Sequence, residues 1–344
     1  MVKTALITGI TGQDGAYLAK LLLEKGYKVY GSRRRGASLN TWRLDELGVS
    51  SRVNMLEMDL VEYSNIMDVI KQHNFDEVYN LAAQSFVSTS FVQPIYTSEV
   101  DGLAVCRILE SIRHLSPHTK FYQASTSEMF GKVQATPQNE STPFYPRSPY
   151  GVAKLYAHWM TINYRESYNL YAASGILFNH ESPLRGQEFV TRKITSSLAR
   201  IKNDMQDVLE LGNIDAKRDW GFAGDYVRGM YLMLQQDKAE DYVLASNDSK
   251  SVRQFIECSA TLLGFEIKWE GAGVNEKGID KKTGKVIIQI NPEFYRPSEV
   301  DILLGDATKA KTKLGWSPEV SFEQMVEMMV ENDVRRIKAG VPLQ

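Results

Sequence analysis

A tyrosine and a lysine one helical turn apart are the residues of this sequence best suited to proton chemistry. Tyr150 and Lys154 lie four positions apart, directly after Ser148-Pro149. A hydroxyl residue followed by proline is typical of a helix start, and residues four apart share one helix face. A phenol has an unperturbed pKa of about 10, and a nearby ammonium favours the phenolate and lowers that pKa. The pair therefore indicates a base that exchanges a proton with an alcohol.

Hydroxyl residues upstream strengthen this interpretation. The run from Ser125 to Ser127 contains Thr126, whose hydroxyl could donate to the phenol oxygen or to a substrate oxygen and so complete a proton relay. A Tyr/Lys pair alone is usually a solvated helix face. Of the 17 tyrosines in the chain, however, only Tyr150 has a lysine four residues on. We therefore predict that Thr126, Tyr150 and Lys154 are catalytic.

The beginning of the chain has the pattern of a dinucleotide site. An apolar run at residues 4–8 ends in a glycine-rich turn, a helical pattern extends to Gly26, and a second strand follows at residues 28–32. In this context the glycines permit a tight turn close to a pyrophosphate, and the helix N-terminus offers N–H groups to the anion. The predicted contacts in the turn are Gly9, Thr11, Gly12, Gln13, Asp14 and Gly15.

The end of the second strand indicates which dinucleotide is bound. A site for NAD usually has a carboxylate here for the ribose 2′-hydroxyl. This strand instead runs into Arg33-Arg34-Arg35 and contains no acid. Guanidinium groups pair with phosphates, so we predict NADP, with Arg33 and Arg34 on the 2′-phosphate. The alternative is an exposed basic loop.

Two further segments are placed at the cofactor by their order along the expected sheet. Asp59-Leu60 follows the third strand and can reach the adenine, and the run after the fourth strand lies under the pyrophosphate and ribose. That run consists of Leu81, Ala82, Ala83, Gln84 and Ser85.

Composition is that of an ordinary soluble globular protein. The 344 residues are 43% hydrophobic and 24% charged, with a formal net charge of −2. This charge argues against general nucleic-acid binding and against a basic membrane-binding surface. Cys106 and Cys258 are far apart without metal-ligand spacing, so we expect inert thiols and no metal site. With no recognisable signal peptide and no apolar run of about 20 residues, we expect a cytoplasmic protein.

Strand and helix patterns alternate through the first half of the chain. Strands are expected at 4–8, 28–32, 55–59, 77–81, 120–124 and 170–178, and helices at 63–73, 95–115 and 149–168. This alternation predicts an α/β fold, a Rossmann-type doubly wound parallel sheet covered on both faces. We expect residues 1–178 to form the cofactor-binding domain. Residues 179–344 are expected to form a smaller, mixed α/β substrate-binding lobe interleaved with the first.

Several longer motifs carry a resemblance to a known family. Thr-Gly-x-x-Gly-x-x-Gly, Leu-Ala-Ala-Gln-Ser and Tyr-x-x-x-Lys are similar to those of the extended short-chain dehydrogenase/reductases that act on nucleotide sugars. The runs at residues 121–131, 142–151, 175–183 and 215–221 narrow the match. With them the whole chain resembles the GDP-mannose 4,6-dehydratases.

This resemblance implies an internal redox reaction. Tyr150 would take the proton of the sugar 4-hydroxyl as hydride leaves C4 for NADP⁺. The resulting ketone acidifies C5–H, a carboxylate removes that proton, and water leaves from C6. The hydride then returns to C6, and C5 is reprotonated. Glu128 is the expected carboxylate. The product would be GDP-4-dehydro-6-deoxymannose, a precursor of sugars such as GDP-fucose or GDP-rhamnose.

Family placement also implies residues for the second half of the site. His180 and Arg185 would lie near the nicotinamide half and the phosphates of the cofactor. The groups expected around GDP-mannose are Ser85, Thr126, Asn179, Val190, Lys193, Arg218, Arg253, Arg296 and Glu299. The basic members suit a nucleotide diphosphate.

Two other functions are compatible with the sequence. A nucleotide-sugar 4-epimerase or 4-reductase of the same fold would need only Thr126, Tyr150 and Lys154. A non-catalytic NADP-binding regulator would have lost the tyrosine or the lysine, and both are present. The family further implies a homodimer or homotetramer, in which the loop at residues 35–40 reaches a neighbouring subunit's cofactor.

Overall fold

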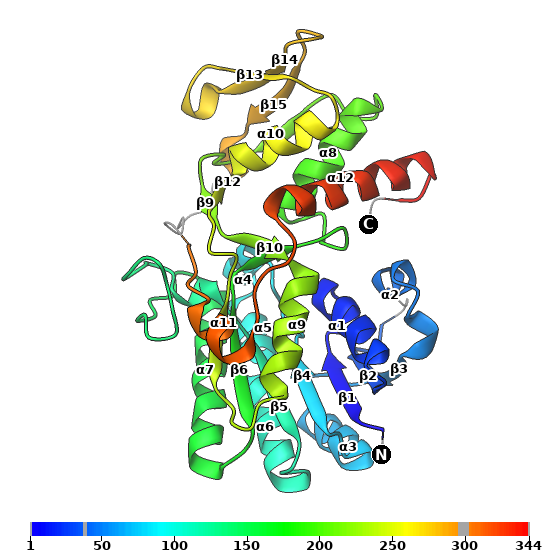
Figure 1. Ribbon diagram of the computed structural model, residues 1–344, viewed down its shortest axis with the longest axis vertical. Coiled ribbons are helices and arrows are strands. Elements are labelled where there is room, and N and C mark those ends of the chain that lie inside the picture. Colours follow the sequence, from blue (N-terminus) through cyan, green and yellow to red (C-terminus); the bar gives the residue numbers. More distant parts are fainter. Residues whose placement is uncertain (1, 37–39, 295–302, 343–344) are drawn as a thin grey trace.

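A parallel seven-stranded sheet forms the larger lobe of the computed structural model, which describes residues 2–36, 40–294 and 303–342 (Figure 1). The strand order is β3-β2-β1-β4-β5-β6-β11, and every neighbouring pair is parallel. The strands are β1 (Thr4–Thr8), β2 (Lys28–Arg33), β3 (Asn54–Glu57), β4 (Glu77–Asn80), β5 (Lys120–Thr126), β6 (Ala172–Leu177) and β11 (Asp241–Leu244). The predicted doubly wound fold is confirmed.

Helices cover both faces of this sheet. One face carries α1 (Gln13–Glu24), α9 (Ala223–Leu234) and α11 (Thr308–Leu314), which share a core with the strands. The other face carries α3 (Tyr63–His73), α6 (Ala104–Leu115) and α7 (Pro149–Tyr168), with a separate core. Because buried parallel strands need an apolar cover on each side, the strands read as nearly continuous apolar runs. Two short helical segments, α2 (Trp42–Glu46) and η1 (Ser50–Arg52), connect β2 to β3.

The segment expected as one helix over residues 95–115 is interrupted. It consists of α5 (Pro94–Thr97), a π-helical turn η2 (Ser98–Leu103) and α6, and it follows a further short helix, α4 (Val87–Val92). A π turn inserts an extra residue into the helix and changes the direction of the side chains that follow. The apolar spacing of the sequence did not reveal this change.

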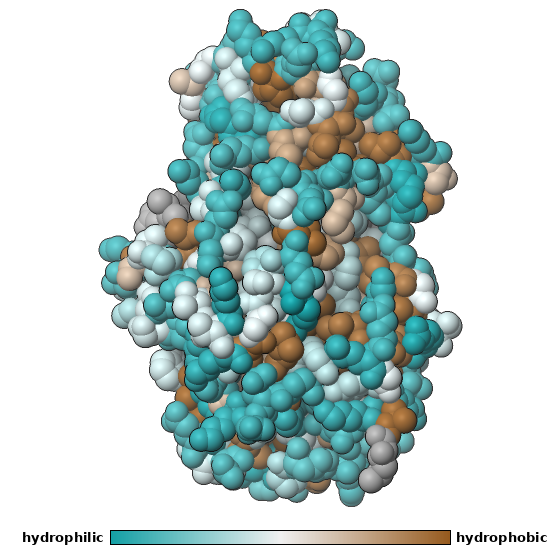
Figure 2. All heavy atoms as spheres, viewed as in Figure 1, coloured by the Kyte–Doolittle hydropathy of each residue, from teal (hydrophilic) through white to brown (hydrophobic). Residues whose placement is uncertain are grey.

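The smaller lobe contains three helices and a second sheet. The helices α8 (Val190–Lys202), α10 (Val252–Leu262) and α12 (Phe322–Lys338) pack on a four-stranded sheet with the order β13-β14-β15-β8. Its strands are β8 (Leu209–Leu211), β13 (Ile267–Glu270), β14 (Lys277–Asp280) and β15 (Val286–Ile290). None of the strands expected from the sequence falls in β13, β14 or β15, so these three strands were missed. In Figure 2, apolar side chains of this lobe emerge between hydrophilic ones.

Short strand pairs connect the lobes. The parallel pair is β7 (Asn179–Glu181) with β10 (Trp220–Phe222), and the antiparallel pair is β9 (Lys217–Arg218) with β12 (Lys250–Ser251). After β10 the chain returns to the larger lobe, where α9 packs beside α1 and β11 completes the sheet. The lobes are therefore interleaved in sequence.

Within the described residues, no helix combines the length and the apolarity that crossing a membrane requires.

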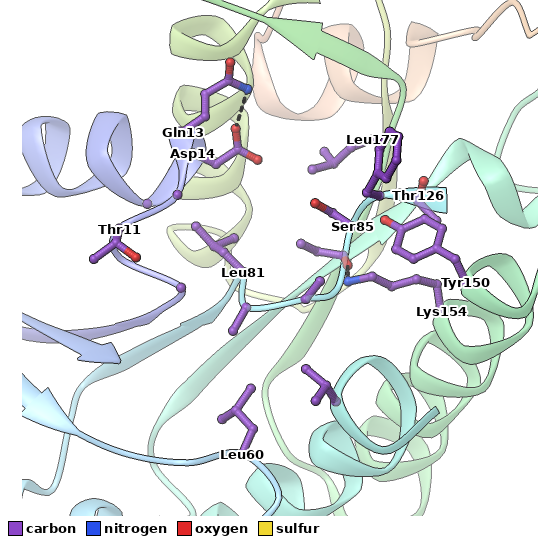
Figure 3. Close-up of a pocket in the computed structure, with 18 of the residues that line it drawn as sticks. Thr11, Gln13, Asp14, Leu60, Leu81, Ser85, Thr126, Tyr150, Lys154 and Leu177 are labelled. Atoms are coloured by element: carbon purple, nitrogen blue, oxygen red, sulfur yellow. Dashed lines mark hydrogen bonds between the residues drawn. The ribbon is translucent and has the colours of Figure 1, made fainter. Parts of the chain in front are cut away.

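The carboxyl ends of the parallel strands meet at one edge, where the glycine turn, the loop after β4 and the start of α7 face one another (Figure 3). The order of strands reverses between β1 and β4. Such a reversal leaves a crevice at the carboxyl edge of a doubly wound sheet. Catalytic and cofactor residues are therefore expected at this edge.

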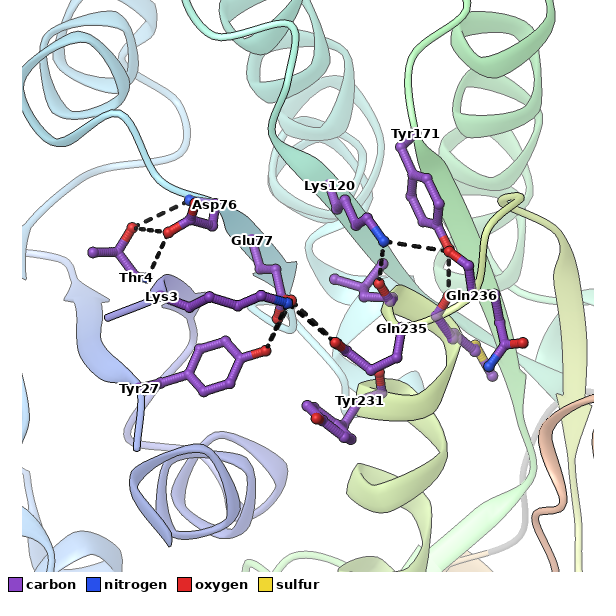
Figure 4. A network of polar contacts seen from close by, with 12 residues as sticks. Lys3, Thr4, Tyr27, Asp76, Glu77, Lys120, Tyr171, Tyr231, Gln235 and Gln236 are labelled. Atoms are coloured by element: carbon purple, nitrogen blue, oxygen red, sulfur yellow. Dashed lines mark hydrogen bonds and ion pairs between the residues drawn. The ribbon is translucent and has the colours of Figure 1, made fainter. Parts of the chain in front are cut away.

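A polar network around Glu77 lies at the opposite, amino edge of the sheet (Figure 4). This carboxylate is 1% exposed and accepts hydrogen bonds from the hydroxyls of Tyr27 (3.0 Å) and Tyr79 (2.8 Å). The Lys3 ammonium (3.2 Å) and the Gln235 amide (3.1 Å) complete its partners. A buried carboxylate is tolerated when donors replace its water. The network therefore stabilises this edge of the sheet.

Candidate active site

A cavity of about 750 Å³ occupies the carboxyl edge of the large sheet. Its walls come from the glycine turn after β1, the end of β2, the loops after β3 and β4, β5, α7 and β7. The predicted residues that line it are Gly9, Thr11, Gly12, Gln13, Asp14, Gly15, Arg33, Arg34, Asp59, Leu60, Leu81, Ala82, Ala83, Ser85, Thr126, Glu128, Tyr150, Lys154, Asn179, His180 and Arg185. One continuous space thus brings together residues that are far apart in the sequence.

The glycine turn is shaped by close backbone contacts. Gly9 has a φ of +69°, and a Cβ there would lie 2.8 Å from the Ala82 backbone. A Cβ on Gly15 would lie 2.4 Å from the Gly9 carbonyl oxygen. Gly12 caps α1 with no side chain over the helix N-terminus. The backbone N–H groups at this end are therefore accessible to an anion such as a pyrophosphate.

His180 and Asp14 form an ion pair beside this turn. The His180 Nε2 lies 2.8 Å from Asp14 Oδ2, and its Nδ1 lies 2.7 Å from the Phe178 carbonyl oxygen. Both oxygens are acceptors, so both ring nitrogens carry hydrogen and the ring is an imidazolium. Burial opposes that charge, but Asp14 raises the pKa of His180 above its ordinary value. The ring also stacks on Tyr226 at 4.5 Å.

Arginines surround the end of β2. Arg33, Arg34 and Arg35 all line the cavity, and the Arg34 guanidinium lies 5.7 Å from the centre of the Tyr96 ring. Sequence reasoning missed Arg43 of α2, which also lines the cavity and donates to the carbonyl oxygens of Leu184 (2.7 Å) and Thr11 (3.1 Å). In the sequence, the position of Arg43 eight residues after Arg35 was the signal that could have indicated its place at the cavity. This end of the cavity is therefore strongly cationic.

The catalytic candidates lie at the other end. Ser148 caps α7, since its hydroxyl oxygen accepts from the Gly151 N–H at 3.0 Å, and the predicted helix start is confirmed. Tyr150 and Lys154 project from α7 towards Thr126 and Ser85 (Figure 3). Tyr150 is 8% exposed and Lys154 is 3% exposed. The Lys154 ammonium donates to the Ala124 carbonyl oxygen at 3.1 Å.

Thr126 links the base to the segment that carries Glu128. Its hydroxyl oxygen accepts from the Glu128 N–H at 3.2 Å, and its hydroxyl hydrogen-bonds to Tyr150 and acts to lower the pKa of that phenol. Because the Thr126 oxygen is already an acceptor, its own proton can be directed at the phenol oxygen. These contacts are compatible with the proton relay that the sequence predicts.

The sequence predicts that the Tyr150 pKa lies below its ordinary value, and this prediction is wrong. Burial raises this pKa well above the ordinary value, the negative charge of Asp101 adds to the effect, and that of Glu128 acts in the same direction. Burial also lowers the pKa of Lys154, against the attraction of Asp101 and Asp14. Burial removes water from both side chains and so disfavours their charged forms, the Tyr150 phenolate and the Lys154 ammonium. This effect on the Tyr150 pKa is larger than the favourable effect of the neighbouring ammonium.

Glu128 faces the same space as the base. It lies on the single turn Ser127–Met129 that follows β5, is half-buried, and lines the cavity together with Tyr150 and Lys154. A carboxylate and a phenol on two sides of one cavity can act on different atoms of one bound sugar. This arrangement distinguishes the site from a relay that has Thr126, Tyr150 and Lys154 alone.

Some predicted residues do not reach the cavity wall. The Gln84 side chain folds onto its own loop, where it accepts from the Phe86 N–H at 2.8 Å. Arg253 pairs with Asp215 (2.9 Å) and Glu276 (2.7 Å). Val190, Lys193 and Arg218 are likewise not among the cavity residues, while Arg296 and Glu299 lie outside the described residues.

Phe189, which was not predicted, lines the cavity, with the Arg185 guanidinium 3.6 Å from its ring centre. Residues 185–189 lie in a loop before α8, so no periodic pattern of the sequence indicated this pair.

Comparison with known proteins places the chain in a family. Residues 6–329 match the family model described as GDP-mannose 4,6 dehydratase. A GDP-mannose 4,6-dehydratase of Vibrio cholerae is 54% identical, over 97% of this chain and 95% of its own length. Among solved structures, a dTDP-glucose 4,6-dehydratase of Streptomyces venezuelae with NAD and TYD bound aligns with a TM-score of 0.82 at 19% identity, covering 99% of this chain and 100% of the other. The structure of RMD from Pseudomonas aeruginosa complexed with NADPH aligns with a TM-score of 0.76 at 22% identity, covering 97% and 100%. By the family match and the close relative, the chain belongs to the GDP-mannose 4,6-dehydratase family.

Proposed function

We propose that this chain is a hydro-lyase that converts GDP-mannose into GDP-4-dehydro-6-deoxymannose. The observation that carries the proposal is the position of Glu128, which lines one cavity with Thr126, Tyr150 and Lys154. The family membership supplies the substrate. A nucleotide-sugar epimerase or reductase that works only at C4 has no step that needs this carboxylate.

The residues of the cavity divide the proposed reaction among them. NADP, held by the glycine turn and the arginines at the end of β2, would supply the hydride acceptor for C4 and the hydride donor for C6. Tyr150 takes the proton of the 4-hydroxyl, and Thr126 donates to the developing oxyanion. Lys154 supplies positive charge beside the phenolate. Glu128 removes the C5 proton, which the neighbouring ketone has made acidic, and passes it to the C6 hydroxyl, which leaves as water. When hydride is delivered to C6, a proton from the surrounding water returns to C5.

The decisive experiment uses the purified protein with GDP-mannose and NADP⁺. Mass spectrometry and NMR should show a product lighter by one water, with no net accumulation of NADPH. An unchanged mass with inversion at C4 would identify an epimerase. Net NADPH formation would show that the hydride does not return to the sugar, and either result would reject the proposal.

We also propose that the cofactor is NADP rather than NAD. Arg33 and Arg34 line the cavity at the end of β2, where the adenosine ribose is held in this fold. The side chain of Arg33 lies 3.5 Å from Glu57 Oε1, and its Nε is buried without a partner among the described residues. A 2′-phosphate would satisfy this guanidinium as a bidentate acceptor.

Replacing Arg33 and Arg34 together by Ala is expected to weaken NADP⁺ binding by about 100-fold, because two charge-assisted contacts to one phosphate are lost. Binding of NAD⁺, which lacks that phosphate, should change by less than about threefold. Titration calorimetry with both cofactors measures the difference, and NAD⁺ serves as the internal control. Equal weakening of the two cofactors would contradict the assignment.

The substrate nucleotide is proposed to lie against the smaller lobe. Asn179 lines the cavity at β7, and its Oδ1 is buried without a partner among the described residues. Lys193 of α8 and Arg218 of β9 supply cations on that side, as do Arg185 at the cavity wall and Arg253 in its pair with Glu276. A diphosphate can compete for such guanidinium groups. The proposal keeps Val190, Arg296 and Glu299 as further contacts.

Homo-oligomerisation is proposed from an exposed apolar surface. Side chains of α5, η2 and α7 lie exposed in a single chain, namely Ile95, Leu103, Val152, Tyr156 and Trp159. Adjacent helices with apolar side chains facing outward are typical of a surface that pairs with a second copy. Replacing Trp159 by Asp should therefore shift the mass measured by light scattering from oligomer to monomer. A wild-type chain that is monomeric at working concentration would reject the proposal.

We further propose that the protein is cytoplasmic. Cys106 and Cys258 are both free. Reduced thiols are the ordinary state in a reducing compartment.

A further inference from the structure

We propose that Asp101 is a positioning residue of the proton relay: its buried carboxylate, on a turn packed against α7, attracts the Lys154 ammonium and sets the pH range in which Tyr150 exchanges a proton. The inference rests on the proposed function. It was not visible in the sequence, because Asp101 lies 49 positions before Tyr150 in a stretch that reads as an ordinary amphipathic helix.

Burial makes the Asp101 carboxylate unusual. It is 1% exposed, and burial raises its pKa to about 6 against the opposing attraction of Lys154. Its Oδ1 accepts from the Gln84 N–H at 2.7 Å, while its Oδ2 is buried without a hydrogen-bond partner among the described residues. A buried carboxylate with one unused oxygen is unfavourable unless a nearby cation compensates for it. Lys154 is the cation whose attraction opposes the rise in the Asp101 pKa.

The π turn brings Asp101 to α7. Asp101 lies in the middle of η2, and the next residue, Gly102, packs on α7, where a Cβ would come within 3.4 Å of the Ala153 carbonyl oxygen. Ala153 immediately precedes Lys154 in α7. A regular helix over the same residues would direct their side chains differently, so the turn is what brings the carboxylate to the lysine.

Asp101 also joins the relay to the cofactor cavity. Gln84, whose N–H it accepts, belongs to the loop after β4 that contributes Ala82, Ala83 and Ser85 to the cavity wall. One carboxylate thus contacts the cofactor loop and attracts the lysine of the relay.

Charges around the relay determine the sign of the effect. Lys154 is attracted by Asp101 and by Asp14. Tyr150 is influenced by the negative charges of Asp101 and Glu128, by the positive charge of Arg185 and by the Thr126 hydroxyl. Removing the Asp101 charge makes the Tyr150 phenolate easier to form and the Lys154 ammonium harder to keep. Both pKa values must therefore fall.

The test is the pH profile of hydride transfer in Asp101→Asn, which keeps the size and can keep the contact with the Gln84 N–H. Hydride transfer is measured in a single turnover with GDP-mannose. Its rise with pH reports formation of the Tyr150 phenolate, and this rise should move to lower pH by about one unit. The matched control is Glu99→Gln, which removes a charge from the same turn. Because Glu99 pairs with Arg107 at 2.6 Å and not with the relay, its profile should coincide with that of the wild type.

A second readout needs no reaction. NADP⁺ affinity, followed across the same pH range, depends on the charge of Lys154 because this side chain lines the cofactor cavity. Its inflection should also move to lower pH in Asp101→Asn, so failure of the proposed dehydration and failure of this inference remain distinguishable. If the Asn variant does not fold, Asp101→Ser removes the same charge and carries the same expectation. Rates that fall equally at every pH, with both profiles unmoved, would overturn the proposal and reduce Asp101 to a structural residue.

Discussion

Replacing Glu128 by Gln is expected to reduce loss of water from GDP-mannose by about 10²–10⁴-fold while hydride transfer from C4 continues. The amide keeps the size and much of the hydrogen bonding of the carboxylate but cannot remove the C5 proton. The reaction should therefore stop at the 4-ketone with reduced cofactor bound. Glu128 lines the cavity beside Tyr150 but is not part of the Thr126–Tyr150–Lys154 relay, so the two steps should separate.

Two measurements follow these steps independently. Absorbance of the reduced nicotinamide reports hydride transfer within one turnover, and incorporation of deuterium from heavy water at C5 reports proton removal. In Glu128→Gln the reduced cofactor should accumulate and deuterium incorporation should nearly vanish. Glu128→Asp, which retains a carboxylate on a shorter side chain, should restore part of the elimination. A variant that loses both steps to the same extent would show that Glu128 only supports the turn Ser127–Met129.

Tyr150→Phe is expected to reduce hydride transfer itself by about 10²–10⁴-fold, because the 4-hydroxyl loses the base that takes its proton. Binding of GDP-mannose should change little, since the ring and its packing remain. The pH dependence provides the sharper result. Burial and Asp101 raise the Tyr150 pKa, so wild-type hydride transfer should increase with pH as the phenolate forms. In the Tyr150→Phe variant this increase should be absent.

Stopped-flow absorbance of reduced nicotinamide across pH measures both the rate and its slope. Tyr168→Phe is the matched control, since Tyr168 lies at the other end of α7 and is 44% exposed. Its profile should follow that of the wild type. A Tyr150→Phe enzyme whose residual rate still rises through the same pH range would identify another group as the base.

The elements that position the site could be predicted because their signals are local. The cap at Ser148, the spacing of Tyr150 and Lys154 on one helix, and the glycine turn before α1 each depend on neighbours within a few residues. The strands β1 to β6 were located to within two residues for the same reason. Order along a parallel sheet then placed the loops after β3 and β4 at one edge.

What could not be predicted depends on contacts distant in sequence. The sign of the Tyr150 pKa shift follows from burial and from Asp101, which belongs to another helix. Arg253 of α10 forms an ion pair with Glu276, and no local pattern of the sequence indicates this pair. The sheet of β13 to β15 was missed because glycines and lysines interrupt its apolar alternation, while its buried residues face a core assembled from α8, α10 and α12.

The late position of β11 has a consequence for synthesis of the chain. Strand β6 is buried along its whole length and needs β11 as its outer neighbour, yet 63 residues separate Leu177 from Asp241 and they build much of the smaller lobe. A nascent chain therefore carries an unpaired, apolar sheet border until translation has passed Leu244. Such a border is prone to associate with other chains, so folding intermediates of this protein should depend on chaperones more than their size alone suggests.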